Sequence, residues 1–249
     1  MLSYNKHAVD LEIRLNDMHV VSSRSNQLGR GQSFLNNCIP FSGNQQLSFI
    51  VSQQDGEDQI DEDAYLQIDI IGVLVDTETQ SIQKYSNILS ISQQGKDVCS
   101  GCRYFKAEVP YSIDIGQNAL DISHHVSIDT KVLIFYKKWN YLTDQNRYDE
   151  ILSMLSLHDY NEVTCHYWNL TEEEKKLRED DFKDILANGY KLVMPTVEDR
   201  LIFYGYGRLV RQRHPDGSTA FVLRNSEGEE YPMDLYLYLP QNSTELQIL

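Results

Sequence analysis

The clearest indication of the fold of the first half of the chain is the stretch Val9-Asp10-Leu11-Glu12-Ile13-Arg14-Leu15. Its apolar residues alternate with charged ones, and this period of two is typical of a β-strand with one buried face. The alternation returns over residues 66–70 and resumes over 73–75, after a one-residue slip beside Gly72 that predicts a β-bulge. The stretch therefore predicts that the chain begins as β structure.

Further strands are expected along the first half. Short apolar or alternating segments occupy residues 47–51, 105–109, 122–128 and 132–136, and polar, glycine-containing connections separate them. Several short strands of this kind favour an antiparallel β-sandwich, which we predict to be jelly-roll-like and to span residues 1–140.

The hydrophobic period changes after Trp139 to that of a helix. Apolar residues at 148, 151, 152 and 155 follow i, i+3, i+4, i+7 spacing, and Asp144 is the expected N-cap. A second helix is predicted to start at Thr171-Glu172-Glu173-Glu174, a capping box, and to end at Asn188-Gly189.

The end of the chain is predicted to be a three-stranded antiparallel meander. Its strands are expected at residues 201–213, 219–224 and 231–239, with turns at Pro215-Asp216-Gly217 and at 225–228. Two helices followed by such a sheet indicate an α+β domain over residues 141–249. The predicted fold is therefore mainly β, with an α+β second half.

The charge balance limits the classes of partner. The 249 residues include 37 Asp or Glu and 22 Lys or Arg, a formal net charge of −15. Proteins that bind nucleic-acid backbones rely on a basic surface, so we expect no nucleic-acid partner. The sequence has no apolar run of about 18 residues, so we expect no membrane span. Residues 1–7 lack the pattern of a signal peptide, which favours a cytoplasmic protein, or a periplasmic one if a leader has been removed.

The charge is segmented along the chain. Residues 51–83 hold nine carboxylates and no Lys or Arg, whereas residues 200–224 hold five arginines and one aspartate. The tail over residues 226–249 is acidic again. Segmentation of this kind favours the steering of a charged partner.

An acidic run at residues 55–63 is the first candidate binding site. Its carboxylates are those of Asp55, Glu57, Asp58, Asp61, Glu62 and Asp63. Such a loop can bind Ca²⁺, although its glycine is misplaced for an EF-hand. A solvated acidic loop is the plainer interpretation, and a protein partner with a basic face is the third.

Tyrosines and arginines near residue 206 form the second candidate. Tyr204 and Tyr206 fall within a Gly-containing strand, and Arg211 and Arg213 have the same parity on it, so both are expected on one face. They are candidates for binding an anionic group or a partner's carboxylate. The alternative is that the two arginines pair with acidic residues of the neighbouring strands.

Cysteine and histidine give weaker signals. Cys99-Ser100-Gly101-Cys102 has the spacing of half a zinc site or of a redox pair, but it falls between predicted strands, which favours a turn. His124 and His125 are expected on opposite faces of a strand, His124 half-buried and His125 on the surface. Cys165-His166 carries no nucleophile signature. We expect no metal site, no catalytic residue and no cofactor.

The C-terminal end resembles a known group of proteins. Residues 201–210, the Pro215-Asp216-Gly217 hairpin and the strand from Met233 to Leu239 are similar to the C-terminal end of some acidic bacterial toxin-immunity proteins. The resemblance covers about fifty residues and implies an inhibitor that blocks the active site of a cognate toxin.

These observations favour a non-enzymatic protein-binding module, with immunity-type neutralisation of a basic toxin as the sharpest version. One alternative is a ligand-binding β-sandwich that takes a carbohydrate, or Ca²⁺ through residues 55–63. Another is an enzyme that uses Cys99, Cys102 or Cys165.

Overall fold

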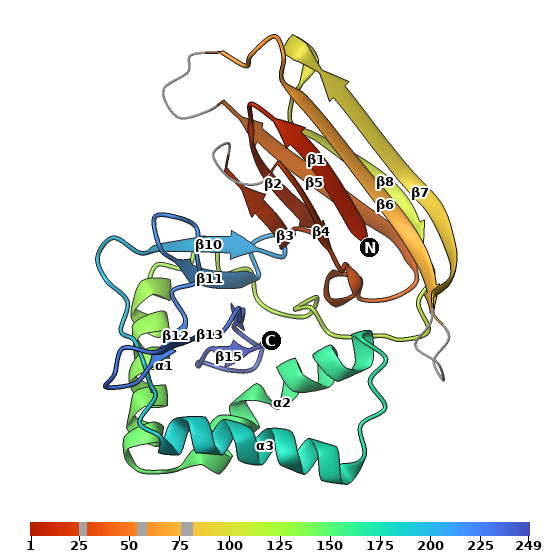
Figure 1. The fold of residues 1–249 in the computed structure, drawn as a ribbon. Helices are drawn as coiled ribbons and strands as arrows, with labels where there is room; N and C mark the ends of the chain where they lie inside the picture. The colour runs from red at the N-terminus through yellow and green to blue at the C-terminus, as the bar shows by residue number, and fades with distance from the viewer. Residues whose placement is uncertain (25–28, 54–58, 76–81) are drawn as a thin grey trace. The chain divides into compact units, whose positions relative to one another are not determined.

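The computed structural model describes residues 1–24, 29–53, 59–75 and 82–249, and these divide into two compact units (Figure 1). Unit 1 comprises residues 1–113 with 165–167, and unit 2 comprises residues 114–164 with 168–249. The described residues form four antiparallel sheets and three α-helices, so the fold is mixed α+β. Residue 140, the expected domain boundary, lies inside the first helix, α1 (Ile128–Asp144).

Unit 1 contains two four-stranded antiparallel sheets. One has the order β4-β1-β6-β7, with β4 at Arg30–Ser33, β1 at Leu2–His7, β6 at Tyr65–Val75 and β7 at Ile82–Gln94. The other has the order β3-β2-β5-β8, with β3 at Met18–Ser23, β2 at Asp10–Leu15, β5 at Gly43–Ser52 and β8 at Gly101–Ala107. Two single 3₁₀ turns, Asn36–Cys38 and Gly95–Asp97, belong to the same unit.

The strand pattern that opens the chain is confirmed. Leu11, Ile13 and Leu15 of β2 are buried, and the charged residues between them are half-buried. Asn16 and Asp17 both have positive φ, 52° and 60°, as a tight two-residue hairpin turn requires, and they connect β2 to β3. The bulge expected near Gly72 is confirmed too, because the β6–β7 register shifts between residues 70 and 71.

The strands predicted at residues 122–128 and 132–136 are wrong. Residues 123–127 form turns, and residues 132–136 lie in α1. Val132, Tyr136 and Trp139 are buried on one face of α1, while Leu133 and Ile134 are exposed by 39% and 55% on the other. The β-branched and aromatic run favours a strand locally, but the helical spacing of the buried residues decides the outcome.

Two more helices follow in unit 2. α2 (Tyr148–Cys165) starts where the periodicity predicts, but Asp144 is the last residue of α1 rather than an N-cap. α3 (Glu172–Ala187) is confirmed together with its capping box. The Glu174 amide donates to Thr171 Oγ1 at 3.2 Å, and the Thr171 amide donates to Glu174 Oε2 at 2.7 Å.

The predicted C-terminal meander is divided between two small sheets. One has the order β10-β11-β14-β15, with β10 at Arg200–Tyr204, β11 at Leu209–Arg213, β14 at Leu237–Tyr238 and β15 at Gln247–Ile248. The other has the order β13-β12-β9, with β13 at Glu230–Pro232, β12 at Val222–Arg224 and β9 at Lys191–Leu192. Residues 201–213 are therefore a hairpin and not one strand, because residues 205–208 turn the chain back.

An aromatic cluster forms the core of unit 2. Phe221 contacts Phe135, Tyr136 and Trp139 of α1, and its ring centroid lies 5.2 Å from that of Trp139 in an edge-on arrangement. Trp139 is fully buried and Phe221 is 4% exposed. This packing fixes α1 against the residues that lead into β12.

Candidate functional site

A groove of about 960 Å³ lies between α2, α3 and residues 231–235 of unit 2. Its α2 wall includes Leu152, Leu155, Asp159 and Glu162, which lie three or four residues apart and so share one helix face. Its α3 wall is built the same way from Lys175, Arg178, Glu179, Phe182 and Ile185. Figure 1 shows α2 and α3 diverging toward the loop that joins them.

The lining of this groove combines apolar and charged side chains from both helices. Leu152 and Leu155 of α2 lie among Phe182 and Ile185 of α3, and Met233 belongs to the same lining. The Phe182 ring also contacts Tyr231, at 6.4 Å between centroids. The charged residues Asp159, Glu162, Lys175 and Arg178 lie nearer the loop that joins the helices than these apolar residues do, so the groove combines apolar and charged surface.

The amino-terminal half of α3 is exposed along its whole length. Every residue from 171 to 181 is exposed, including Leu177 at 60%. Arg178 bridges this half to α2, because its guanidinium contacts Glu162 Oε2 at 3.1 Å. The same guanidinium lies 5.1 Å from the centre of the Trp168 ring. This half of α3 is therefore held by its cap and by polar contacts and not by a buried stripe.

The groove lining is predominantly acidic. It includes six carboxylates and two basic side chains, Lys175 and Arg178. The carboxylates are those of Asp149, Asp159, Glu162, Glu179, Asp181 and Asp234. Asp149 pairs with Lys183 at 2.7 Å, and Asp234 pairs with Arg211 at 2.9 Å. The charge surplus therefore gathers around Asp159, Glu179 and Asp181.

Asp159 is a half-buried carboxylate in the lining of the groove. Burial raises the pKa of Asp159; His158 and Arg178 partly oppose this rise, and the neighbouring carboxylates Glu162 and Glu179 reinforce it. Its charged form is therefore stabilised by whatever cation approaches from the groove. No motif at the sequence level marks this position.

Three residues of α2 also place possible metal-binding atoms close together. Ligand atoms of His158, Asp159 and Glu162 lie within 4.8 Å of one another. Two of them already have polar contacts, since Glu162 accepts a hydrogen bond from Arg178 and His158 Nδ1 lies 3.1 Å from the Leu249 carbonyl oxygen. A guanidinium beside the cluster competes with a metal ion for the same carboxylate.

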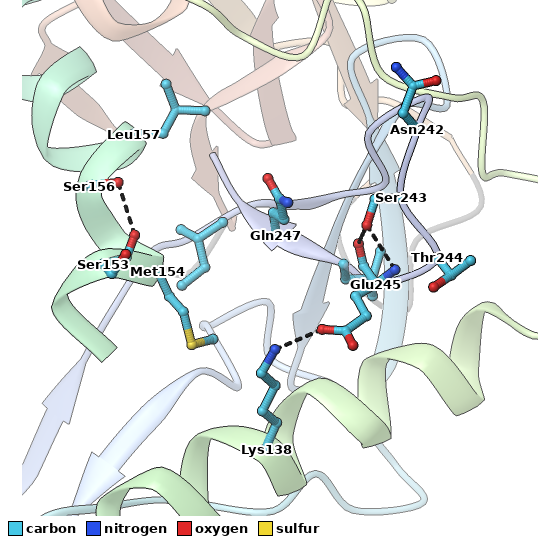
Figure 2. Close-up of a pocket in the computed structure, with 12 residues that line it drawn as sticks. Lys138, Ser153, Met154, Ser156, Leu157, Asn242, Ser243, Thr244, Glu245 and Gln247 are labelled. Carbon is cyan, nitrogen blue, oxygen red and sulfur yellow. Dashed lines mark hydrogen bonds and ion pairs between the residues drawn. The ribbon is translucent and has the colours of Figure 1, made fainter. Parts of the chain in front are cut away.

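Another pocket of unit 2, of about 500 Å³, lies among α1, α2 and residues 242–248 (Figure 2). Lys138 Nζ and Glu245 Oε2 form an ion pair of 2.7 Å within it. Figure 2 shows Ser153 bonded to Ser156, and Ser243 bonded within the 243–245 turn. Lys138, Ser156, Ser243 and Glu245 of this pocket are thus engaged with other groups of its lining.

The acidic run predicted as a binding site is only partly described. Asp55, Glu57 and Asp58 lie outside the described residues. Asp61, Glu62 and Asp63 are exposed, Glu62 pairs with Lys96 at 2.9 Å, and an Asp63 carboxylate oxygen lies 3.4 Å from His7 Nε2. Asp61 accepts a hydrogen bond from the Asp63 amide. These three residues belong to unit 1 and the α2–α3 groove to unit 2.

The Tyr and Arg candidates lie together in unit 2 but differ in exposure. Arg211 and Arg213 share one face of β11, as predicted, and both are buried. Their common partner is Asp234, at 2.9 Å and 3.6 Å, and Arg211 stacks 3.5 Å from the Tyr236 ring centre. Pairing with an acidic residue of a neighbouring segment was the alternative left open by the sequence.

The two tyrosines lie in the hairpin that precedes these arginines. Tyr204 is buried, and Tyr206 is 54% exposed with a φ of 59°. The expectation that Gly205 and Gly207 belong to a strand is wrong, because positive φ at both glycines produces the turn between β10 and β11. Tyr206 therefore projects from a turn.

The cysteines and histidines occupy separate places. Cys99 lies in the loop before β8 and Cys102 within β8, and Cys165 is buried. His124 and His125 lie near a turn and not on a strand, with His124 exposed and His125 half-buried, opposite to expectation. His166 contacts Phe34 edge-on at 6.3 Å between ring centroids.

The sequence pattern does not single out the groove residues. The helical period is marked by apolar residues, and it gives no prominence to Asp159 and Glu162, although they continue the face of Leu152 and Leu155. The signal in the sequence that points to the groove is the pair of carboxylates, Asp159 and Glu162, at the same helical spacing as the apolar stripe. A distant segment, residues 231–235, completes the groove, and helix periodicity says nothing about it.

Comparison with protein-family models, with curated proteins and with solved structures found no match to this chain. In the described part of the chain, none of the helices is both long enough and apolar enough to cross a membrane.

Proposed function

We propose that this chain is a non-enzymatic protein-binding module whose partner presents a basic surface. The observation that carries the proposal is the α2–α3 groove, where an apolar floor is bordered by six carboxylates and two basic residues. Apolar contact supplies affinity in such a site, and complementary charge raises the association rate and selects the partner. The formal net charge of −15 acts in the same direction.

The most specific form of this proposal is that the chain neutralises a basic toxin, as an immunity protein does. Its support is the acidic balance together with the resemblance of the C-terminal segment described above. Inhibition of this type requires only that the bound protein cover the toxin's active site, and no chemistry of its own.

We also propose that unit 1 is a β-sandwich built from its two four-stranded sheets. The support is the burial of alternate residues in both sheets: Leu66 and Ile68 in β6, and Leu47 and Phe49 in β5, are exposed by at most 1%. Two sheets that each bury one face are stabilised by packing those faces together.

Capture of partners from the native host tests the function. Immobilised wild-type chain should retain a basic protein at low salt and release it as ionic strength rises, since screening weakens charge complementarity. The matched control is a variant with Asp159→Asn, Glu179→Gln and Asp181→Asn, which keeps side-chain size and removes three charges. Recovery of no protein by the wild-type chain, across buffers that keep it folded, would contradict the proposal.

A further inference from the structure

We infer that the α2–α3 groove is the docking site for one amphipathic α-helix of the partner, with an apolar stripe flanked by Lys or Arg. This inference rests on the proposed function and specifies the partner segment that the groove accepts. It is carried by the geometry of the two helices, by the apolar floor and by the distribution of charge.

The geometry leaves room for a helix beside two others. α2 and α3 each turn one face toward the groove, and residues 171–181 on the α3 side are exposed throughout. A helix placed there would contact both walls, as a third helix does in a bundle. Three turns, or about 11 residues, extend about 16 Å along such a groove.

The apolar floor matches the way in which grooves bind helices. Phe182 and Ile185 are half-buried, and Met233 joins them from the segment after β13. Helices that dock in grooves anchor through apolar residues at i, i+3, i+4 and i+7, so these three side chains are suitable contacts for such a stripe. Methionine adapts its shape to different apolar surfaces, which suits a binding site.

The charges determine what flanks the stripe. Asp159 lies on the α2 side of the groove and Glu179 on the α3 side, so a carboxylate stands on each wall. A Lys or Arg on either flank of the incoming helix would therefore meet a carboxylate. An acidic helix would be repelled on both sides, so the groove discriminates by charge as well as by shape.

A second copy of this chain is a poorer occupant. Its net charge of −15 opposes self-association at low salt. A helix on one copy that entered the groove of the next would also form a heterologous contact, which extends into chains unless the rotation closes a ring. A basic partner helix is not repelled by the net charge of this chain, and its binding does not extend into chains of molecules.

Calorimetry with three synthetic peptides of about 15 residues tests the inference. The first has Leu at i, i+3, i+4 and i+7 with Lys on the flanks, the second has the same composition with the Leu positions scrambled, and the third has Glu in place of Lys. We expect binding of the first alone, weakened about fivefold or more by Asp159→Asn or Asp181→Asn. Asp180→Asn should change it less than about twofold, because Asp180 does not line the groove.

The same measurements separate the two proposals. Any of three results would overturn the groove inference. The first is equal binding of the scrambled peptide, and the second is an equal loss of peptide affinity in Asp159→Asn, Asp181→Asn and Asp180→Asn. The third is self-association of the chain in sedimentation that does not depend on peptide. If the wild-type chain and the triple variant capture a basic host protein equally well, the docking site is wrong and the protein-binding function stands. If neither captures a protein, the function itself fails.

Discussion

Arg178 of α3 and Glu162 of α2 form an ion pair of 3.1 Å between the two helical walls of the groove, and the Arg178 guanidinium also lies over the Trp168 ring. This contact links the exposed half of α3 to α2. It also places a positive charge in a site that we propose to be selective for positive charge. The arginine is therefore expected to restrain the helices at the expense of affinity for a basic partner.

Replacement of Arg178 separates these two effects. Arg178→Gln should strengthen binding of the Leu/Lys peptide about threefold, mainly through a faster association rate, because it removes a like charge. The free energy of unfolding should fall by about 1 kcal/mol or less, the usual range for an exposed ion pair. Stopped-flow tryptophan fluorescence reports the rate, and Lys176→Gln on the same helix is the control. Weaker peptide binding by Arg178→Gln would contradict the account.

The capping box sustains the exposed half of α3. Thr171→Ala removes the oxygen that accepts from the Glu174 amide, and it should cost about 1 kcal/mol of helix stability. Because residues 171–181 are exposed, little packing compensates for the loss, and amide hydrogen exchange over 172–181 should accelerate most. Thr171→Ser keeps the hydroxyl and should restore protection. Faster exchange in α1, with α3 unchanged, would refute the role of the box.

The Asp199–His214 pair makes stability depend on pH. Burial opposes ionisation of Asp199, but bonds from the Thr196 amide and from His214, whose Nδ1 lies 2.6 Å away, outweigh it and hold the pKa of Asp199 below its usual value. A depressed carboxyl pKa contributes stability above the unfolded value of about 3.9 that is lost as pH falls through the folded pKa. Urea unfolding from pH 6 to pH 3 should show a difference between wild type and Asp199→Asn that shrinks toward acid. A difference in the free energy of unfolding that grows toward acid would contradict the depressed pKa of Asp199.

The aromatic core of unit 2 depends on Phe221. Phe221→Ala leaves a cavity beside Trp139, Phe135 and Tyr136 and should cost about 3–5 kcal/mol. Tryptophan emission, in which the buried Trp139 reports on this core, should shift to the red at lower denaturant than in the wild-type chain. Phe34→Ala, in a side chain that is 68% exposed, should change stability by less than about 0.5 kcal/mol. Similar losses in both variants would argue against this description of the core.

How far the sequence predicts the fold depends on how local the deciding signal is. The alternation at 9–15, the bulge near Gly72 and the capping box at Thr171 involve neighbouring residues, and all three are confirmed. The segment 132–136 is different. Its local preference favours a strand, and only burial makes it helical: Val132 is buried, and Tyr136 and Trp139 are buried against Phe221, far along the chain.

The candidate site was less predictable than the fold for the same reason. Same-side placement of Arg211 and Arg213 follows from strand parity, but their burial depends on Asp234 and Tyr236, which arrive from another segment. The α2–α3 groove likewise needs residues 231–235 to complete it. Clusters of charge that are close in sequence were visible, whereas those assembled in space were not.

Methyl NMR of the methionines tests the central claim most directly. Met233 lines the α2–α3 groove, whereas Met154 lines the pocket of Figure 2 and not the groove, although Ser153 and Ser156 line both. A peptide seated in the groove should therefore contact Met233 and not Met154. We predict that saturating Leu/Lys peptide shifts the Met233 methyl resonance and leaves that of Met154 in place. A shift of Met154 without Met233, or no shift of either at saturation, would contradict the assignment of this groove as the binding site.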